Sequence, residues 1–159
     1  MAGRVQRLRA TFFRSQWRDT GQRLQRGETV EYNGEAYRPD MVLGAPRRGI
    51  KVSYCTDTRP TGGIAALCTG SDLLVCEGIY GENERLEDAQ EKKHMIFSEA
   101  AALAWHADCG ELWITHYSPS LKDPGIFLEN AGRIFGNAKA GADLMKKTLR
   151  FDENEILKT

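Results

Sequence analysis

Long apolar runs, sequence repeats and paired metal-ligand motifs are all missing from this chain. No apolar run approaches the roughly 18 residues that a membrane-spanning helix needs, so the sequence predicts no membrane span. The absence of internal repeats and low-complexity tracts argues against a repeat architecture. With 159 residues, 41% apolar residues and 16 glycines, the chain instead fits one globular domain with a buried core.

Histidine and cysteine are scarce, and neither is spaced as a metal-binding motif. The three histidines, at positions 94, 106 and 116, form no HxH or HxxxH pair, so spacing alone does not indicate a metal site. The four cysteines form no CxxC pair. They are Cys55, Cys68, Cys76 and Cys109. We therefore expect reduced core cysteines in a cytoplasmic protein rather than a disulfide framework.

The net charge of zero conceals a strong asymmetry along the chain. Residues 1–26 contain seven arginines and a single acidic residue, Asp19, which gives this segment a charge of +6 and leaves −6 for the rest. A basic arm of this kind can bind nucleic-acid phosphates through counterion release. The same composition also fits an organelle presequence or an isolated disordered arm, so both alternatives stay open.

The apolar pattern predicts strands that alternate with helices. The Asn33-Gly34 pair between two short strand-like segments predicts a hairpin over residues 27–39. Strands are expected at residues 51–56, 72–76, 111–115 and 148–151, and helices at 64–69, from Ser98 to about 110, and at 129–135, with a charged loop or helical turn over 83–93. Such alternation is typical of βαβ units, so we expect an α/β fold with a largely parallel sheet.

Three polar side chains come directly after predicted buried strands. They are Asp57, Glu77 and His116. Because ligands in open α/β sheets gather beyond the carboxyl ends of the strands, we expect these side chains to share one rim. Each also has a structural explanation, as a hydrogen-bonded turn, a buried hydrogen-bonded acid and a strand-end histidine respectively. The residues alone leave both interpretations open.

Four segments occur in an order and spacing that resemble one enzyme family. They are Asp57-Thr58-Arg59-Pro60, the strand that ends at Glu77, His94 followed by Ser98-Glu99-Ala100-Ala101, and Thr115-His116-Tyr117-Ser118. Together with residues 23–30 and 40–49, they resemble ribonuclease Z, the tRNA 3′-processing endonucleases of the metallo-β-lactamase fold. The similarity covers about residues 22–155.

The resemblance implies a zinc-dependent endoribonuclease that removes 3′ trailers from precursor tRNA. Asp57 matches a carboxylate that bridges two zinc ions, and His116 matches a terminal zinc ligand. Glu77 and His94 match a catalytic pair that handles protons beside the scissile phosphate, with Glu77 orienting His94 or relaying charge. These roles are expectations carried by the resemblance.

Other positions carry weaker expectations from the same resemblance. Arg59 and Ser118 are candidates for substrate binding, through phosphate contact or support of the neighbouring ligands. Ile96 stands where the family usually has threonine, which removes a threonine cap three residues before Glu99. Cys76 stands where many members have histidine.

The sequence lacks the family's His-x-His-x-Asp-His motif. Asp57 and His116 cannot hold two metals alone, so the resemblance identifies the chain with the carboxyl-terminal half of the fold. Residues 27–159 would form one mixed sheet with packed helices, half of an αββα sandwich, and residues 1–26 a basic arm or poorly matched segment.

The expected partners are precursor tRNA and the missing amino-terminal half or a second copy. A non-catalytic RNA-binding remnant and part of another metallo-β-lactamase-fold hydrolase are the alternatives.

A half-sandwich would leave one face of its sheet without the opposing sheet. The residues concerned are Val52, Tyr54, Leu74, Cys76, Trp113 and Thr115. Side chains alternate between the two faces of a strand, so only one subset of these residues would lie on the bare face. The sequence does not say which subset.

Overall fold

The computed structural model describes residues 17–44 and 48–150, which form two compact units. The first unit lies before Ile50, and the second comprises residues 50–150. Most of the expected basic arm, residues 1–16, lies outside the described residues. No helix in the described part of the chain is long and apolar enough to cross a membrane.

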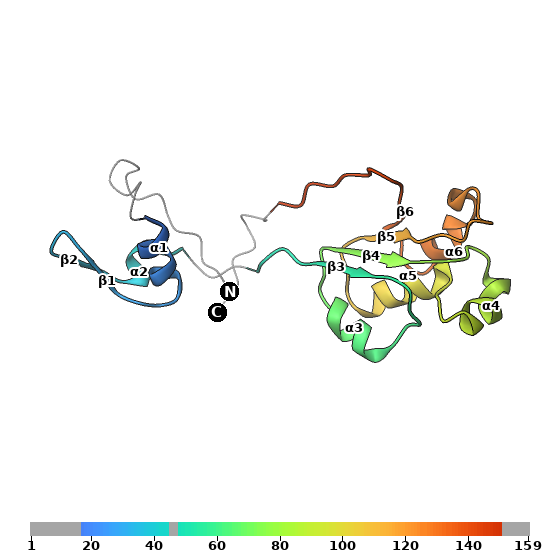
Figure 1. Cartoon of the computed structure of the whole chain (residues 1–159), viewed down its shortest axis with the longest axis horizontal. Coiled ribbons are helices and arrows are strands. Elements are labelled where there is room, and N and C mark those ends of the chain that lie inside the picture. Colours follow the sequence, from blue (N-terminus) through green and yellow to red (C-terminus); the bar gives the residue numbers. More distant parts are fainter. Residues whose placement is uncertain (1–16, 45–47, 151–159) are drawn as a thin grey trace. The chain divides into compact units, whose positions relative to one another are not determined.

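The first unit contains two helices and a hairpin around a small core (Figure 1). Helix α1 spans Trp17–Gln25, inside the segment expected to be an arm. Strands β1 (Val30–Tyr32) and β2 (Glu35–Tyr37) pair antiparallel, and α2 spans Pro39–Val42. Asn33 and Gly34 have φ angles of 53° and 80°, the positive values that a type I′ turn requires, and this confirms the predicted hairpin.

The second unit is built on a four-stranded sheet in the order β3-β4-β5-β6. The strands are β3 (Val52–Cys55), β4 (Leu73–Glu77), β5 (Leu112–Thr115) and β6 (Ala138–Ala140). All neighbouring strands pair parallel, so the α/β prediction is confirmed. This sheet is parallel rather than mixed as expected, and the antiparallel pairing belongs to the separate two-stranded hairpin of the first unit.

Helices connect successive strands, and all of them except the one at residues 86–91 pack against one face of this sheet. They are α3 (Gly62–Cys68), α4 (Leu86–Glu91), α5 (Phe97–His106) and α6 (Leu128–Gly132), with 3₁₀ turns at Asn83–Arg85 and Pro124–Phe127. Leu74, Leu112 and Ile114 of the sheet pack with Phe97 and Ala104 of α5 in one core, and each of these side chains is fully buried. Burial of this continuous apolar layer is the main stabilising contribution.

The opposite face of the sheet carries exposed apolar side chains on β3. Val52 and Tyr54 are 55% and 67% exposed. The strand register aligns Tyr54 with Val75 and Trp113, which places these three on the same face. Of the six strand residues that alternation divides between the two faces, Leu74 and Cys76 lie on the helix-covered face. All four cysteines are free and buried in the core there.

The start of α5 and the position of the last strand differ from the sequence prediction. Helix α5 begins at Phe97 with Ile96 at the N-cap position, whereas Ser98 was expected to cap it. The Ser98 hydroxyl instead hydrogen-bonds the side chain of Asn83. The last strand is Ala138–Ala140; the prediction of a strand from 148 was wrong for residues 148–150, which form no strand, and Phe151 lies outside the described residues.

Candidate metal and proton-transfer site

The carboxyl ends of the three central strands bring the predicted rim residues together. Asp57 follows β3 by two residues, Glu77 is the last residue of β4, and His116 comes directly after β5. Because β3, β4 and β5 are parallel neighbours, their carboxyl ends lie at one edge of the sheet. The three residues therefore lie at one edge of the sheet, as their positions after the strands predict.

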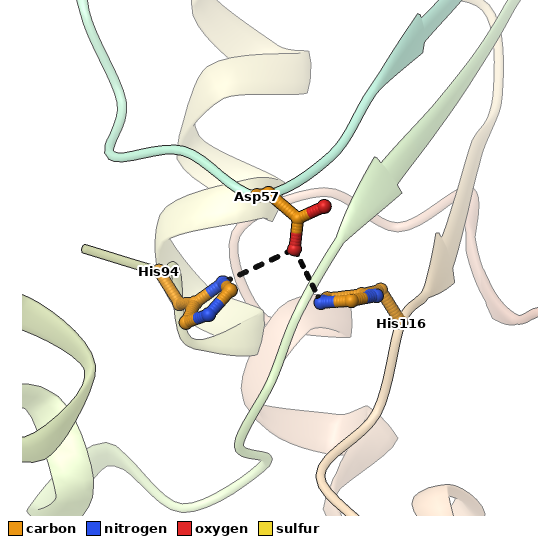
Figure 2. Close-up of side chains that lie close together, drawn as sticks. All are labelled: Asp57, His94 and His116. Atoms are coloured by element: carbon orange, nitrogen blue, oxygen red, sulfur yellow. Dashed lines mark ion pairs between the residues drawn. The ribbon is translucent and has the colours of Figure 1, made fainter. Parts of the chain in front are cut away.

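Asp57 and His116 are in direct contact across this edge. The Nε2 atom of His116 lies 2.7 Å from Oδ1 of Asp57 (Figure 2). Both residues have positive φ angles, 52° for Asp57 and 57° for His116, which are uncommon for residues with a Cβ. Such backbone strain persists where the surrounding structure holds it, and it concentrates at functional sites. Both side chains are accessible, at 62% and 42% exposure.

His94 reaches the same place from the loop between α4 and α5. Its Nδ1 atom lies 3.9 Å from Oδ1 of Asp57, and its ring centroid is 5.4 Å from that of His116. Figure 2 shows the Asp57 carboxylate facing both imidazoles. No spacing pattern in the sequence predicts this approach, because His94 lies in a loop.

Glu77 is fully buried behind His94 and accepts three hydrogen bonds. One comes from the backbone amide of Thr58, a second from that of Met95 at 3.2 Å, and a third from Nδ1 of His94 at 2.9 Å. A carboxylate surrounded by donors acts as the acceptor, so we assign the ring proton of His94 to Nδ1. Its Nε2 atom is then left with a lone pair for a metal or a proton.

Arg59 and Ser118, the two expected substrate-binding residues, have other partners in this structure. The Arg59 guanidinium donates to both carboxylate oxygens of Glu99 and to the carbonyl oxygen of His94. The Ser118 hydroxyl lies 2.8 Å from that of Ser120. Sequence reasoning missed Glu99 as part of the site, since nothing in the sequence connects positions 59 and 99.

The donor set fits a single divalent cation. Asp57, His94 and His116 each offer a ligand atom, and these atoms lie within 4.8 Å of one another. Two imidazole nitrogens and a carboxylate oxygen are ligands that zinc accepts, and three protein ligands are the usual number at a catalytic zinc. The resemblance implies metal binding for Asp57 and His116, and the structure places His94 beside them. Three ligands cannot complete a dinuclear centre.

Comparison with known proteins gives strong sequence matches over most of the chain. No protein-family model matches this chain. A ribonuclease Z of Clostridium acetobutylicum is 53% identical over 131 residues, which cover 82% of this chain and 42% of that protein. A ribonuclease Z of Lachnoclostridium phytofermentans is 53% identical over 133 residues, which cover 84% of this chain and 44% of that protein.

Among solved structures, the metallo-β-lactamase-fold protein YhfI from Bacillus subtilis matches with a TM-score of 0.48 and 25% identity, covering 55% of this chain and 35% of that one. The sequence relatives carry the assignment, and the chain spans less than half of their length. Over that part, the chain is homologous to ribonuclease Z.

Proposed function

We propose that this chain supplies one half of the active site of a zinc-dependent tRNA 3′-processing endonuclease. The observation that carries the proposal is the meeting of Asp57, His94 and His116 at one sheet edge, with buried Glu77 bonded to His94. The relatives named ribonuclease Z are more than twice as long as their matched segments. The proposed partners are therefore precursor tRNA and the missing amino-terminal half, which would carry the His-x-His-x-Asp-His motif, or a second copy.

Zinc, when bound, would activate water and stabilise the negative charge that develops on the phosphate. Asp57 and His116 would hold the metal, since their ligand atoms are already close and accessible. His94 can instead move a proton at Nε2, because Glu77 accepts a hydrogen bond from Nδ1–H and thereby fixes the orientation of the ring. In the complete site we assign His94 to proton transfer, with the missing half supplying the remaining ligands.

This division of roles is tested in an enzyme completed by adding the missing half from a ribonuclease Z relative. Asp57→Ala and His116→Ala should abolish cleavage of a 3′-extended precursor tRNA and reduce bound zinc, measured by mass spectrometry. His94→Ala should keep zinc and tRNA affinity and slow the chemical step, by roughly 100-fold or more. If His94→Ala loses as much zinc as His116→Ala, His94 is a ligand and the proposed proton role is wrong.

The same experiment separates the proposal from its main competitor. A non-catalytic RNA-binding remnant would bind precursor tRNA but leave it intact even in the completed protein. The predicted cytoplasmic location stays a prediction.

A further inference from the structure

Arg59 connects the turn that carries Asp57 to the loop that carries His94. Its Nη1 atom donates to the carbonyl oxygen of His94 at 2.5 Å and to Oε2 of Glu99 at 2.7 Å. Its Nη2 atom donates to the other carboxylate oxygen of Glu99. This is the two-pronged geometry that a planar guanidinium makes with a carboxylate and that a lysine cannot reproduce.

Glu99 is itself held at the start of α5. Its Oε2 atom accepts a hydrogen bond from the backbone amide of Ile96 at 3.1 Å, which supplies half of a capping box even though Ile96 has no capping hydroxyl. Helix α5 is fixed in the core through Phe97 and Ala100, both fully buried. The guanidinium is thus attached to a rigid element of the fold.

The His94 loop needs such an anchor because its backbone is irregular. Lys93 has a φ angle of 63°, and the His94 amide donates to the carbonyl oxygen of Ala89 at 2.8 Å. Arg59 holds the next peptide group along the chain, at the His94 carbonyl, while Glu77 holds the ring. Both the backbone and the imidazole of His94 are therefore constrained.

We propose that Arg59 is a positioning residue that fixes the His94 imidazole relative to Asp57. This inference deepens the proposed function and rests on it for the catalytic consequence. It replaces direct phosphate contact by Arg59, because the side chain is three-quarters buried and both terminal nitrogens of the guanidinium are already hydrogen-bonded. A phosphate would have to displace the Glu99 carboxylate, which already neutralises the charge of Arg59.

The first test uses the full chain, metal-free, and requires no activity. Imidazole nitrogen NMR of wild type should show the ring proton of His94 on Nδ1 and slow exchange of that proton with water. Arg59→Lys and Glu99→Gln should each speed this exchange at least about tenfold. Arg133→Lys is the matched control, since Arg133 pairs with Glu129 on the exposed surface of α6. Amide spectra of each variant verify the fold.

Unchanged His94 signals in both Arg59→Lys and Glu99→Gln, with the fold intact, would overturn the inference. Because this readout involves neither zinc nor tRNA, it fails independently of the proposed endonuclease function. Arg59→Ala is a stronger change that can be added if it folds, and the two conservative variants suffice without it.

The second test separates positioning from substrate contact in the completed enzyme. A positioning role predicts that Arg59→Lys lowers kcat by about 10- to 100-fold with KM for precursor tRNA unchanged, since a small misplacement of a proton-transfer group slows chemistry. The double variant with Glu99→Gln should be no slower than either single variant, because both act through one contact. A raised KM with unchanged kcat would instead assign Arg59 to substrate binding.

Discussion

At the scale of single residues, Glu77 is the buried support of the site. It has no exposed surface, and its carboxylate holds Thr58, Met95 and His94 in place. Buried charges are tolerated only when donors compensate for the lost water. The same contacts that orient His94 should therefore also contribute to folding.

Replacing Glu77 by alanine should lower the free energy of unfolding by about 2–3 kcal/mol, because buried donors lose their acceptor and a void is left. Urea denaturation measures this loss. Glu129→Ala, at an exposed ion pair, is the control and should cost less than about 0.5 kcal/mol. An effect of Glu77→Ala no larger than that of the control would show that the buried network contributes nothing to folding.

Removing a metal-binding side chain from the isolated chain should weaken a zinc complex that is already weak. Three ligands in a partly exposed cluster bind zinc poorly compared with a closed site. Asp57→Ala and His116→Ala should each lower the affinity for Co²⁺, followed by its visible absorption, at least about tenfold. His106→Ala lies outside the cluster and serves as the control. Equal affinities in all four proteins would mean that the metal binds elsewhere.

For some of these residues, the sequence alone predicts that they meet at the site, and for others it does not. Asp57, Glu77 and His116 follow strands directly, so the rule that ligands gather at strand ends places them together. His94 reaches the site from an irregular loop, and only the resemblance suggested it. The contact between Arg59 and Glu99 spans 40 positions without any periodic pattern, so it emerges only from the folded chain.

At the scale of elements, Glu111 ties the segment after β6 to the sheet. It receives hydrogen bonds from Trp113 on β5, from Lys139 on β6 and from Lys147 beyond β6. Burial by itself would raise the pKa of Glu111, but the three donors outweigh burial and lower the pKa to about 2. The charged carboxylate therefore stabilises the fold.

This lowered pKa predicts an acid-sensitive contribution to stability. A group whose pKa falls on folding stabilises the protein above its unfolded pKa, near 4.5, and the contribution is lost as the pH falls from there towards 2. The advantage of wild type over Glu111→Gln, at most about 3 kcal/mol at pH 6, should shrink steadily between pH 5 and 2 in urea titrations. Glu129→Gln is the control. A difference that does not change with pH would show that the ionised form of Glu111 is not favoured by folding.

Most elements follow from local signals in the sequence, and the exceptions have physical reasons. Strands β3, β4 and β5 are compact apolar runs, and Asn33-Gly34 suits its turn, so these were predicted. Strand β6 was missed because three residues, Ala-Lys-Ala, carry too weak a pattern and depend on pairing with β5. The predicted start of α5 was wrong because Glu99, inside the helix, caps it by accepting a hydrogen bond from the backbone amide of Ile96.

At the scale of the whole molecule, the sheet has one face buried by helices and one that is partly bare. Val52 and Tyr54 are exposed on the side opposite the core. In an αββα sandwich this side would pack on the second sheet, at about 10 Å. We expect the sheet of the missing half to cover it, in keeping with a chain that spans less than half of its relatives.

Without that half, the chain should self-associate or bind a hydrophobic dye, because exposed apolar patches promote association. Light scattering over a concentration series measures this. Val52→Lys with Tyr54→Lys should reduce the association, whereas Leu67→Lys, at an exposed apolar residue of α3, should not. A well-behaved monomer with no dye binding and a cooperative melt would mean that the segment closes its own core.

The most direct test of the central claim is cleavage of a 3′-extended precursor tRNA in zinc-containing buffer, by the chain alone and by the chain with the complementary half of a ribonuclease Z relative. Asp57 and His116, the two ligands that we assign to the complete site, provide only part of a dinuclear centre. We therefore predict no cleavage by the chain alone and specific removal of the 3′ trailer once the half carrying His-x-His-x-Asp-His is added, with Asp57→Ala inactive in both. Specific cleavage by the chain alone, or an intact tRNA in a properly assembled complex, would contradict the claim.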